Sequence, residues 1–351
     1  MTLERLPTGE QPLPLRVDAM RVQVSGADQS DLPIFSQDWW LSIVSRCPDY
    51  RDVKVVQGNE VLGRLPFILS ARKPGLTWGH NPHWSHMAGP IVDQRLSRTE
   101  QTGVISSLLE QLPRGISFNF VCSPSLAYAD IVRSAFKQAG FEHTTQITYV
   151  RPPSFGDVLD TRKSKHRGHF KRAAKELHCV DISAQEFVQF YGANLDAQGK
   201  TSYSPLGILP CLIEEAISRG QARAIAAKSK CDDRSGICQL SAFNDAAIVY
   251  IWDDYRCYYW LSTRRTPHPG DSFAKPHPDA TKFLVVKAME DAQAMNLIFD
   301  TDGVTTAGSA NLYRNIFGLR EVQCRDVFQR VTVLERLRQK CRQHFRGLIA
   351  D

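Results

Sequence analysis

The predicted order of helices and strands repeats once along the chain, and this repeat limits the possible folds more than any other feature of the sequence. In each half, hydrophobic spacing predicts the order helix, strand, helix, strand. In the first half these elements are at residues 103–112, 116–122, 129–140 and 143–150. In the second half they are at residues 282–295, 297–300, 309–317 and 320–333. The closing corners also match by residue type, since AFKQAGFEHTTQITYV in the first half corresponds to LYRNIFGLREVQCRDV in the second. A repeated unit of about 170 residues predicts two similar α/β domains packed together.

Antiparallel strands are predicted ahead of the repeated elements in both halves. In the first half, residues 52–69 are typical of two strands joined by a turn at Gly58. In the second half, a helix at residues 209–220 leads to predicted strands at 222–229, 237–244, 246–254 and 257–262. Each domain is therefore expected to contain a mixed central sheet flanked by helices.

The limits of the two domains follow from where these patterns begin and end. Residues 1–30 are mostly polar and contain prolines, which predicts a loose N-terminal lead-in with an edge strand near residues 20–24. The first domain is predicted at residues 31–150 and the second at residues 155–333, with a basic C-terminal tail at residues 334–351.

Composition excludes several classes of protein. Of the 351 residues, 42% are hydrophobic and 23% charged, which is typical of a globular protein with room for two domains. No stretch approaches the roughly 18 consecutive apolar residues of a membrane span, and the acids and prolines of the N-terminus do not fit a signal peptide, so we expect a cytoplasmic protein with no integral membrane association. The nine cysteines contain no CxxC pair, which argues against a disulfide framework or a zinc knuckle.

Positive charge is concentrated in two places. Residues 161–175, TRKSKHRGHFKRAAK, carry seven Lys and Arg and no acid, and residues 334–347 carry five basic residues against one acid. The net charge of the whole chain is only +6, so the remainder is net acidic. Such local charge suits a partner that bears phosphates, although a charged run on a helix can equally be a solvated face.

Several motifs in this order resemble the GNAT acyltransferases, and in particular the FemABX-like or BioF-like branch with two GNAT units in tandem. The resemblance lies in PIFSQDWW, LGRLPFIL, KHRGHFKRAAK, and IFDTDG followed by the helix ending LYRNIFG, and it covers most of residues 31–333. It implies two tandem GNAT-like domains and an N-acyltransferase that forms an amide on an amine-bearing acceptor. The acyl group would come from an aminoacyl-tRNA or an acyl-CoA, as a co-substrate rather than a tightly bound cofactor.

The predicted donor site departs from an ordinary GNAT pattern. A typical GNAT holds the pyrophosphate of coenzyme A on backbone N–H groups of a glycine-rich loop at a helix N-terminus. In the corresponding place this sequence has RRTPHPGDSFAKPHPDAT, with one glycine and four prolines that lack an N–H. Both donors stay open, but the missing loop and the basic segment favour aminoacyl-tRNA, which makes tRNA an expected partner.

Asp300 and Arg314 are the predicted catalytic residues. Asp300 and Asp302 follow a predicted strand, and strand ends in open sheets are a usual place for chemistry. Beside the apolar Phe299, Asp300 is expected to take the proton of the attacking amine. By the resemblance, Arg314 occupies the basic position before the helix-terminal Phe-Gly and would hold a phosphate or the oxyanion. The alternatives are a turn whose carboxylates bond their own backbone and a solvated arginine.

The predicted substrate-binding residues lie in the basic segment and in the loops around the expected cleft. By the resemblance, Lys165 and Arg167 face that cleft and contact acceptor or tRNA phosphates; otherwise they belong to a solvated helix face. Packing is as good an explanation as binding for the remaining candidates, which are Trp84, His86, Tyr203, Trp260 and Arg264. His80, His83 and His86 are spaced as zinc ligands on a helix would be, but Gly79 and Pro82 argue against a helix there, so no metal site is predicted.

The sequence thus predicts an acyltransferase, with one alternative of a different class. The alternative is a non-catalytic module in which the basic helix binds RNA or an anionic glycan and the acyltransfer cleft is vestigial. An acyltransferase that uses the Asp300 carboxylate would lose activity on Asp300→Asn, whereas such a module would not.

Overall fold

The computed structural model describes residues 32–73, 76–123, 126–159, 164–229, 244–266, 275–303 and 306–338. The first half of the chain contains η2 (Ile34–Ser36), α1 (Asp38–Val44), β1 (Tyr50–Gln57), β2 (Glu60–Lys73), β3 (Leu76–His80), β4 (Ile91–Val92), α2 (Arg98–Glu110), β5 (Ser117–Cys122), α3 (Ala129–Gln138) and β6 (Glu142–Arg151). The predicted turn between β1 and β2 is present. Gly58 in this turn has a φ of 58°, a backbone conformation that is strained for most residues with a side chain.

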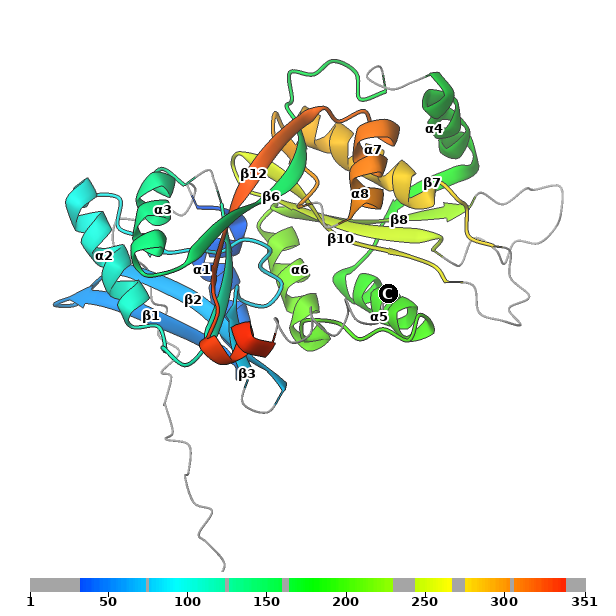
Figure 1. The fold of residues 1–351 in the computed structure, drawn as a ribbon. Coiled ribbons are helices and arrows are strands. Elements are labelled where there is room, and N and C mark those ends of the chain that lie inside the picture. The colour runs from blue at the N-terminus through cyan, green and yellow to red at the C-terminus, as the bar shows by residue number, and fades with distance from the viewer. Residues whose placement is uncertain are drawn as a thin grey trace, which may run out of the picture.

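The second half follows the same plan with additions at its start. It contains α4 (Ser164–Glu176), β7 (Leu177–Asp181), α5 (Ala184–Ala197), η3 (Leu206–Ile208), α6 (Leu209–Ser218), β8 (Ala222–Ser229), β9 (Ala246–Trp252), β10 (Arg256–Arg264), α7 (Ala280–Ala294), β11 (Ile298–Asp300), α8 (Ala307–Asn311), the π-helical turn η5 (Leu312–Ile316) and β12 (Glu321–Arg330). Figure 1 shows α7 and α8 on one face of the strands of this half and α5 and α6 on the other.

In the part of the chain described, twelve strands form one mixed sheet in the order β1-β2-β3-β5-β12-β6-β11-β10-β9-β8-β7, with β4 paired to β2. The pairing repeats between the halves. In the first, β1, β2 and β3 are antiparallel neighbours and β3 is parallel to β5; in the second, β8, β9 and β10 are antiparallel neighbours and β10 is parallel to β11. A parallel pair needs a crossover connection, and α2 and α7 occupy the two connections. The predicted α/β class with a repeated mixed sheet is confirmed.

The last strand of each repeat pairs with the sheet of the other repeat. β12 is antiparallel to β5 of the first half, and β6 is antiparallel to β11 of the second. β6 and β12 also pair with each other along most of their length, which joins the two halves into one sheet (Figure 1). A boundary at residues 150–155 therefore separates the repeats along the sequence, although β6 and β12 each pair with strands of the other repeat. That residues 31–150 and 155–333 are two separate domains stays a prediction.

A few predictions at the level of elements were incomplete. β3, β4, β7 and α5 were not predicted. β7 was missed because Phe170, Ala173 and Leu177 have helical spacing that runs past the observed end of α4 at Glu176. The predicted helix at residues 309–317 is divided between α8 and the π-helical turn η5. The lead-in at residues 1–30 with its edge strand, all but the last residue of the predicted strand at 237–244 and most of the tail lie outside the described residues.

One hydrophobic core spans both halves of the molecule. Trp40 of α1 packs edge-on against Trp260 of β10, with ring centroids 5.2 Å apart, and both belong to a buried cluster that includes side chains of α5 and α6. Trp84 and Met87 of the loop at residues 81–90 belong to the same cluster. This loop of the first half is thereby held against the second half, where the charged cluster described below lies. None of the described helices is long and apolar enough to cross a bilayer.

Candidate functional site

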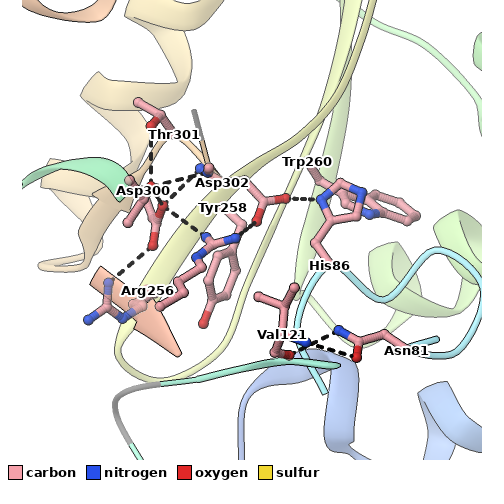
Figure 2. A network of polar contacts seen from close by, with 12 residues as sticks. Asn81, His86, Val121, Arg256, Tyr258, Trp260, Asp300, Thr301 and Asp302 are labelled. Atoms are coloured by element: carbon pink, nitrogen blue, oxygen red, sulfur yellow. Dashed lines mark hydrogen bonds and ion pairs between the residues drawn. The ribbon is translucent and has the colours of Figure 1, made fainter. Parts of the chain in front are cut away.

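Two arginines and two aspartates form a buried charged cluster where the two halves of the sheet meet. Asp300 ends β11, and its Oδ1 accepts a hydrogen bond from Arg325 Nη2 of β12 at 3.1 Å. Its Oδ2 accepts one from Arg256 Nη1 of β10, also at 3.1 Å. Arg325 donates through Nη1 to Asp302 Oδ1 at 2.8 Å. Each aspartate is thus paired with a guanidinium, which is the condition under which charges are tolerated in a protein interior (Figure 2).

Asp302 links this cluster to a histidine of the first half. Its Oδ1 binds Arg325, and its Oδ2 contacts Nδ1 of His86 (Figure 2). Burial opposes ionisation of Asp302, but its interactions with His86 and Arg325 outweigh it and hold the pKa of Asp302 below its usual value. The carboxylate is therefore an anion at neutral pH. Asp302 also has a φ of 59°, a left-handed conformation that few non-glycine residues adopt and that aspartate tolerates better than most.

The loop at residues 81–90 holds His86 in place through its tryptophan contacts. Trp84 donates its indole N–H to the Pro205 carbonyl at 2.9 Å, and Trp260 donates to the Trp84 carbonyl at 3.0 Å. Trp84 itself has a φ of 61°, a strained conformation that reverses the chain between His83 and His86. The two histidines consequently contact different partners, since His83 contacts Asp49 and His86 contacts Asp302.

His86 combines a fixed orientation with partial exposure. Its ring stacks on Phe35 with centroids 5.9 Å apart, and its side chain is 35% exposed, whereas that of Asp302 is 2% exposed. Asp302 contacts Nδ1, and no described residue hydrogen-bonds to Nε2. An imidazole with one nitrogen on a buried carboxylate and the other available is the arrangement of a general base, because the carboxylate fixes the tautomer and stabilises the imidazolium that forms.

A small hollow opens on the charged cluster. It is lined by Met87, Ser123, Thr148, Arg256, Asp300, Gln323 and Arg325. It has no room for a ligand inside it, so a substrate would have to lie against this hollow rather than within it.

The structure brings some of the predicted site residues together. His86 contacts the cluster that contains Asp300, and Trp84 and Trp260 support the loop that carries His86. The two tryptophans are 7% and 4% exposed, and each donates its indole N–H to a backbone carbonyl, which favours packing; their role in substrate binding stays a prediction.

Asp300 lies in the site, but its surroundings differ from the expected apolar wall. It is 1% exposed, and besides the two arginines its Oδ1 accepts hydrogen bonds from Thr148 Oγ1 at 2.5 Å and from its own turn at Asp302 N at 2.8 Å. Oxygens already occupied by four donors leave little room for a substrate proton. This geometry favours a positioning role for Asp300, and its catalytic assignment stays a prediction.

The remaining predicted residues lie apart from the charged cluster. Arg314 is exposed on η5, with its guanidinium 5.9 Å from the centre of the Tyr149 ring. Tyr203 is fully exposed, and Arg264 is exposed and donates to the Pro276 carbonyl at 3.2 Å. Their roles in catalysis or binding stay predictions.

The basic segment forms α4, which packs on α7 and β7 at the outer end of the second half (Figure 1). His277 Nε2 lies 2.8 Å from Glu176, and His169 lies 3.7 Å from Asp279 at the start of α7. Arg167 is half-buried on this helix, and the Lys165 side chain lies outside the described part of the chain. The expected orientation of these two residues toward the cleft stays a prediction.

The sequence reasoning missed Arg325, Arg256 and Thr148. Thr148 Oγ1 bonds Asp300, and Arg256 also donates to Gln323 Oε1 at 2.6 Å, so all three fix the aspartates. The sequence did contain a signal that could have identified Arg325. Arg325 and Asp326 are adjacent opposite charges that interrupt the apolar alternation of a long predicted strand. Charged residues in the middle of a strand must find partners when that strand is central in a sheet.

Comparison with known proteins yields structural matches only. No protein-family model matches the sequence, and no curated protein matches it significantly. The structure is similar to that of FemX, with a TM-score of 0.55 at 10% identity, over 87% of this chain and 94% of FemX. It is also similar to the C-terminal domain (DUF2156) of a proposed lysylphosphatidylglycerol synthetase from Agrobacterium fabrum, with a TM-score of 0.54 at 12% identity, over 90% of this chain and 91% of that one. The chain therefore has the fold of FemX and of this DUF2156 domain, and the FemABX-like fold predicted from the sequence is confirmed.

Proposed function

We propose that the protein is an acyltransferase that moves an acyl group onto an amine, with His86 as the general base and Asp302 as the residue that orients it. The observation that carries this proposal is the contact of His86 Nδ1 with the buried Asp302 carboxylate, while Nε2 has no hydrogen-bond partner among the described residues and the side chain is partly exposed. The FemABX-like fold supports the reaction class, and one structural neighbour is named for the synthesis of a lysyl compound.

In this reaction His86 Nε2 takes the proton of the acceptor ammonium, which frees the nitrogen lone pair to attack the acyl carbon. The new N–C bond forms, the ester or thioester bond of the donor breaks, and the proton held on Nε2 passes to the leaving oxygen or sulfur. The free Nε2 then takes the second proton that the nitrogen loses on becoming an amide and releases it to solvent. Asp302 stays ionised throughout and stabilises the imidazolium each time it forms. Arg325 keeps Asp302 in place through its hydrogen bond to Oδ1.

An aminoacyl-tRNA is the proposed donor, because carboxylates occupy the helix starts at which a GNAT binds pyrophosphate. α7 begins after Asp279, whose carboxylate accepts a hydrogen bond from Lys282 Nζ at 2.6 Å. α2 begins after Ser97, and Glu100 closes a capping box by accepting from the Ser97 N–H at 2.8 Å. The negative charge at each helix N-terminus repels a pyrophosphate, and at α2 the Glu100 carboxylate also takes a backbone N–H that could bind one.

The basic helix α4 supports the same donor. Its sequence carries several Lys and Arg with no acid until Glu176. A polyanion such as tRNA gains affinity from such a surface by releasing counterions, independently of its sequence. The reaction would take place in the cytoplasm, where charged tRNA is available.

The proposal is tested by donor consumption. Wild-type protein and His86→Gln are incubated separately with tRNA charged with labelled amino acids and with labelled acetyl-CoA, each in the presence of a panel of amines. We expect the wild type alone to move label from tRNA to a product that resists mild alkali, as an amide does and an ester does not. Transfer from acetyl-CoA instead would keep the acyltransferase and reject the donor. If neither donor is consumed and both proteins bind tRNA or an anionic glycan equally, the protein is a non-catalytic module.

A further inference from the structure

A second cluster with metal-binding chemistry lies on the other side of Trp84, apart from the His86 contact with Asp302. Cys47, Asp49 and His83 each offer one ligand atom, and these atoms all lie within 4.8 Å of one another. Cys47 and His83 are each 6% exposed, whereas the Asp49 side chain is 31% exposed and gives the cluster an opening to solvent. None of the three is used in the proposed acyl transfer.

The donor set fits zinc better than the other common divalent ions. A thiolate sulfur, an imidazole nitrogen and a carboxylate oxygen are the ligands that Zn²⁺ accepts in four-coordinate sites. Mg²⁺ and Ca²⁺ select oxygen ligands, so a cysteine and a histidine among three donors count against them. With three protein ligands, the fourth position would hold water or a substrate atom.

Ser204, from the second half of the chain, supplies the partner that a metal-bound histidine requires. His83 Nε2 faces Asp49 at 2.8 and 3.0 Å, and Ser204 Oγ lies 3.3 Å from the other ring nitrogen, Nδ1. Without a metal, Nε2 carries the hydrogen and donates to Asp49. With a metal on Nε2, the hydrogen moves to Nδ1 and is donated to Ser204 Oγ, the kind of outer contact that metal-bound histidines almost always make.

The ligands are held by backbone contacts before any metal arrives. The Tyr50 N–H donates to the Cys47 carbonyl at 3.1 Å, which forms the turn that places Asp49, and the Asp49 carbonyl accepts from Leu69 N at 2.9 Å. His83 lies next to Trp84, whose indole N–H donates to the Pro205 carbonyl, and this hydrogen bond holds the loop that carries His83. A site whose ligands are already ordered loses little conformational entropy on binding.

We infer that Cys47, Asp49 and His83 bind one Zn²⁺ and that Ser204 orients His83 for it. Binding replaces the hydrogen of the Cys47 thiol with the metal and releases that hydrogen as a proton, and no electron is transferred. Because Ser204 belongs to the second half, the metal would also tie the two halves together through His83.

The experiment uses Co²⁺ because its absorption spectrum depends on its ligands, whereas bound Zn²⁺ has no visible absorption. The full chain, freed of metal with a chelator, is titrated with Co²⁺ and then with Zn²⁺. We expect one equivalent of Co²⁺ to bind, with visible bands of four-coordinate geometry and a near-ultraviolet band of thiolate-to-cobalt charge transfer. One equivalent of Zn²⁺ should abolish both, and the binding of the first metal ion should release a proton measurable with a pH indicator.

Four variants separate this site from other metal binding. Cys47→Ser should remove the charge-transfer band, His83→Asn should remove stoichiometric binding, and Ser204→Ala should weaken affinity by roughly 10–100-fold, as removal of an outer hydrogen-bond partner does. Cys324→Ser, which changes an exposed thiol on β12, should leave the spectrum unchanged. Circular dichroism of each variant checks that it is folded. Absence of one-equivalent binding in the wild type, or a charge-transfer band that survives Cys47→Ser, would overturn the inference.

Discussion

Nδ1 of His86 contacts the carboxylate of Asp302, although 216 residues separate them along the chain. His86 lies on the loop before β4 of the first half, and Asp302 follows β11 of the second, so the pair forms only when the two halves assemble. Arg325 donates hydrogen bonds to both Asp302 and Asp300 and so links the pair to the rest of the buried charged cluster. The proposed base is therefore built from both repeats.

Removing either member of this pair should lower the rate of acyl transfer. We expect His86→Gln to reduce turnover by roughly 10²–10⁴-fold, the usual weight of a general base, with little change in donor affinity. Asp302→Asn should reduce it comparably, because an uncharged partner neither fixes the tautomer nor stabilises the imidazolium. The measurement is single-turnover transfer of label from the donor. His178→Gln, on the exposed side of β7, is the matched control and should retain full activity.

The ionisation of Asp302 should make stability depend on pH in the acid range. The pKa of Asp302 is lower in the folded protein than the value of about 3.9 expected in the unfolded chain, so its contribution to stability is complete above pH ~4 and is lost as pH falls through the folded pKa. In urea unfolding, the free-energy difference between wild type and Asp302→Asn should be constant from about pH 5 to 7 and shrink toward about pH 3. A difference that grows on acidification would show that Asp302 is protonated in the folded state.

Asp300→Asn separates a positioning role from a catalytic one. Removing the charge leaves Arg256 and Arg325 short of a buried counter-ion, and breaking a buried ion pair costs about 3–5 kcal/mol of unfolding free energy. We therefore expect a large loss of stability, with a smaller loss of turnover per folded molecule than His86→Gln causes. Unchanged stability together with a turnover loss of roughly 10²–10⁴-fold would instead identify Asp300 as the base.

The basic helix should account for part of the salt dependence of tRNA binding. Lys165→Ala combined with Arg167→Ala is expected to weaken binding and to reduce the slope of log K against log salt by roughly 0.7–0.9 for each phosphate that is no longer neutralised. Arg46→Ala combined with Lys137→Ala removes the same charge from exposed sites of the first half and is the control. Equal salt slopes for the two double variants would assign α4 to a solvated face.

Two glycines of the first half should respond to alanine in opposite directions. A Cβ at Gly79 of β3 would lie 2.2 Å from the Phe118 ring of β5, so Gly79→Ala should destabilise the protein by about 1–3 kcal/mol through overpacking. Gly103 lies exposed within α2, and a Cβ there would meet no atom within 4 Å, so Gly103→Ala should stabilise by up to about 1 kcal/mol. Urea unfolding of both variants measures the contrast, and equal effects would contradict the packing of β3 on β5.

The candidate site could be predicted only in part. Asp300, Asp302 and His86 stood out because their residue types and places at strand ends or in a loop are visible in the sequence. The roles assigned to them could not be settled, because a carboxylate behaves differently beside an apolar wall and between two guanidinium groups. Which of these environments surrounds Asp300 depends on Arg256 and Arg325, 44 and 25 residues away.

The sequence by itself determined the kinds of element and their repeated order. Hydrophobic periods of about two and 3.6 residues are local properties, so β12 and α7 were predictable without knowledge of their neighbours. The end of α4 and the start of β7 were not, because Leu177 continues a helical spacing that only its pairing with Ser229 of β8 interrupts.

Only the tertiary structure decided which strands are neighbours. A period of two tells which face of β6 or β12 is buried but not which strand lies beside it, since any extended backbone offers the same hydrogen-bonding groups. The exchange of β6 and β12 between the repeats depends on long-range packing of the whole sheet. The same packing places Asp302 beside Arg325 and His86, because β11 is bound to β6, β6 to β12, and the loop that carries His86 to the core shared by both halves.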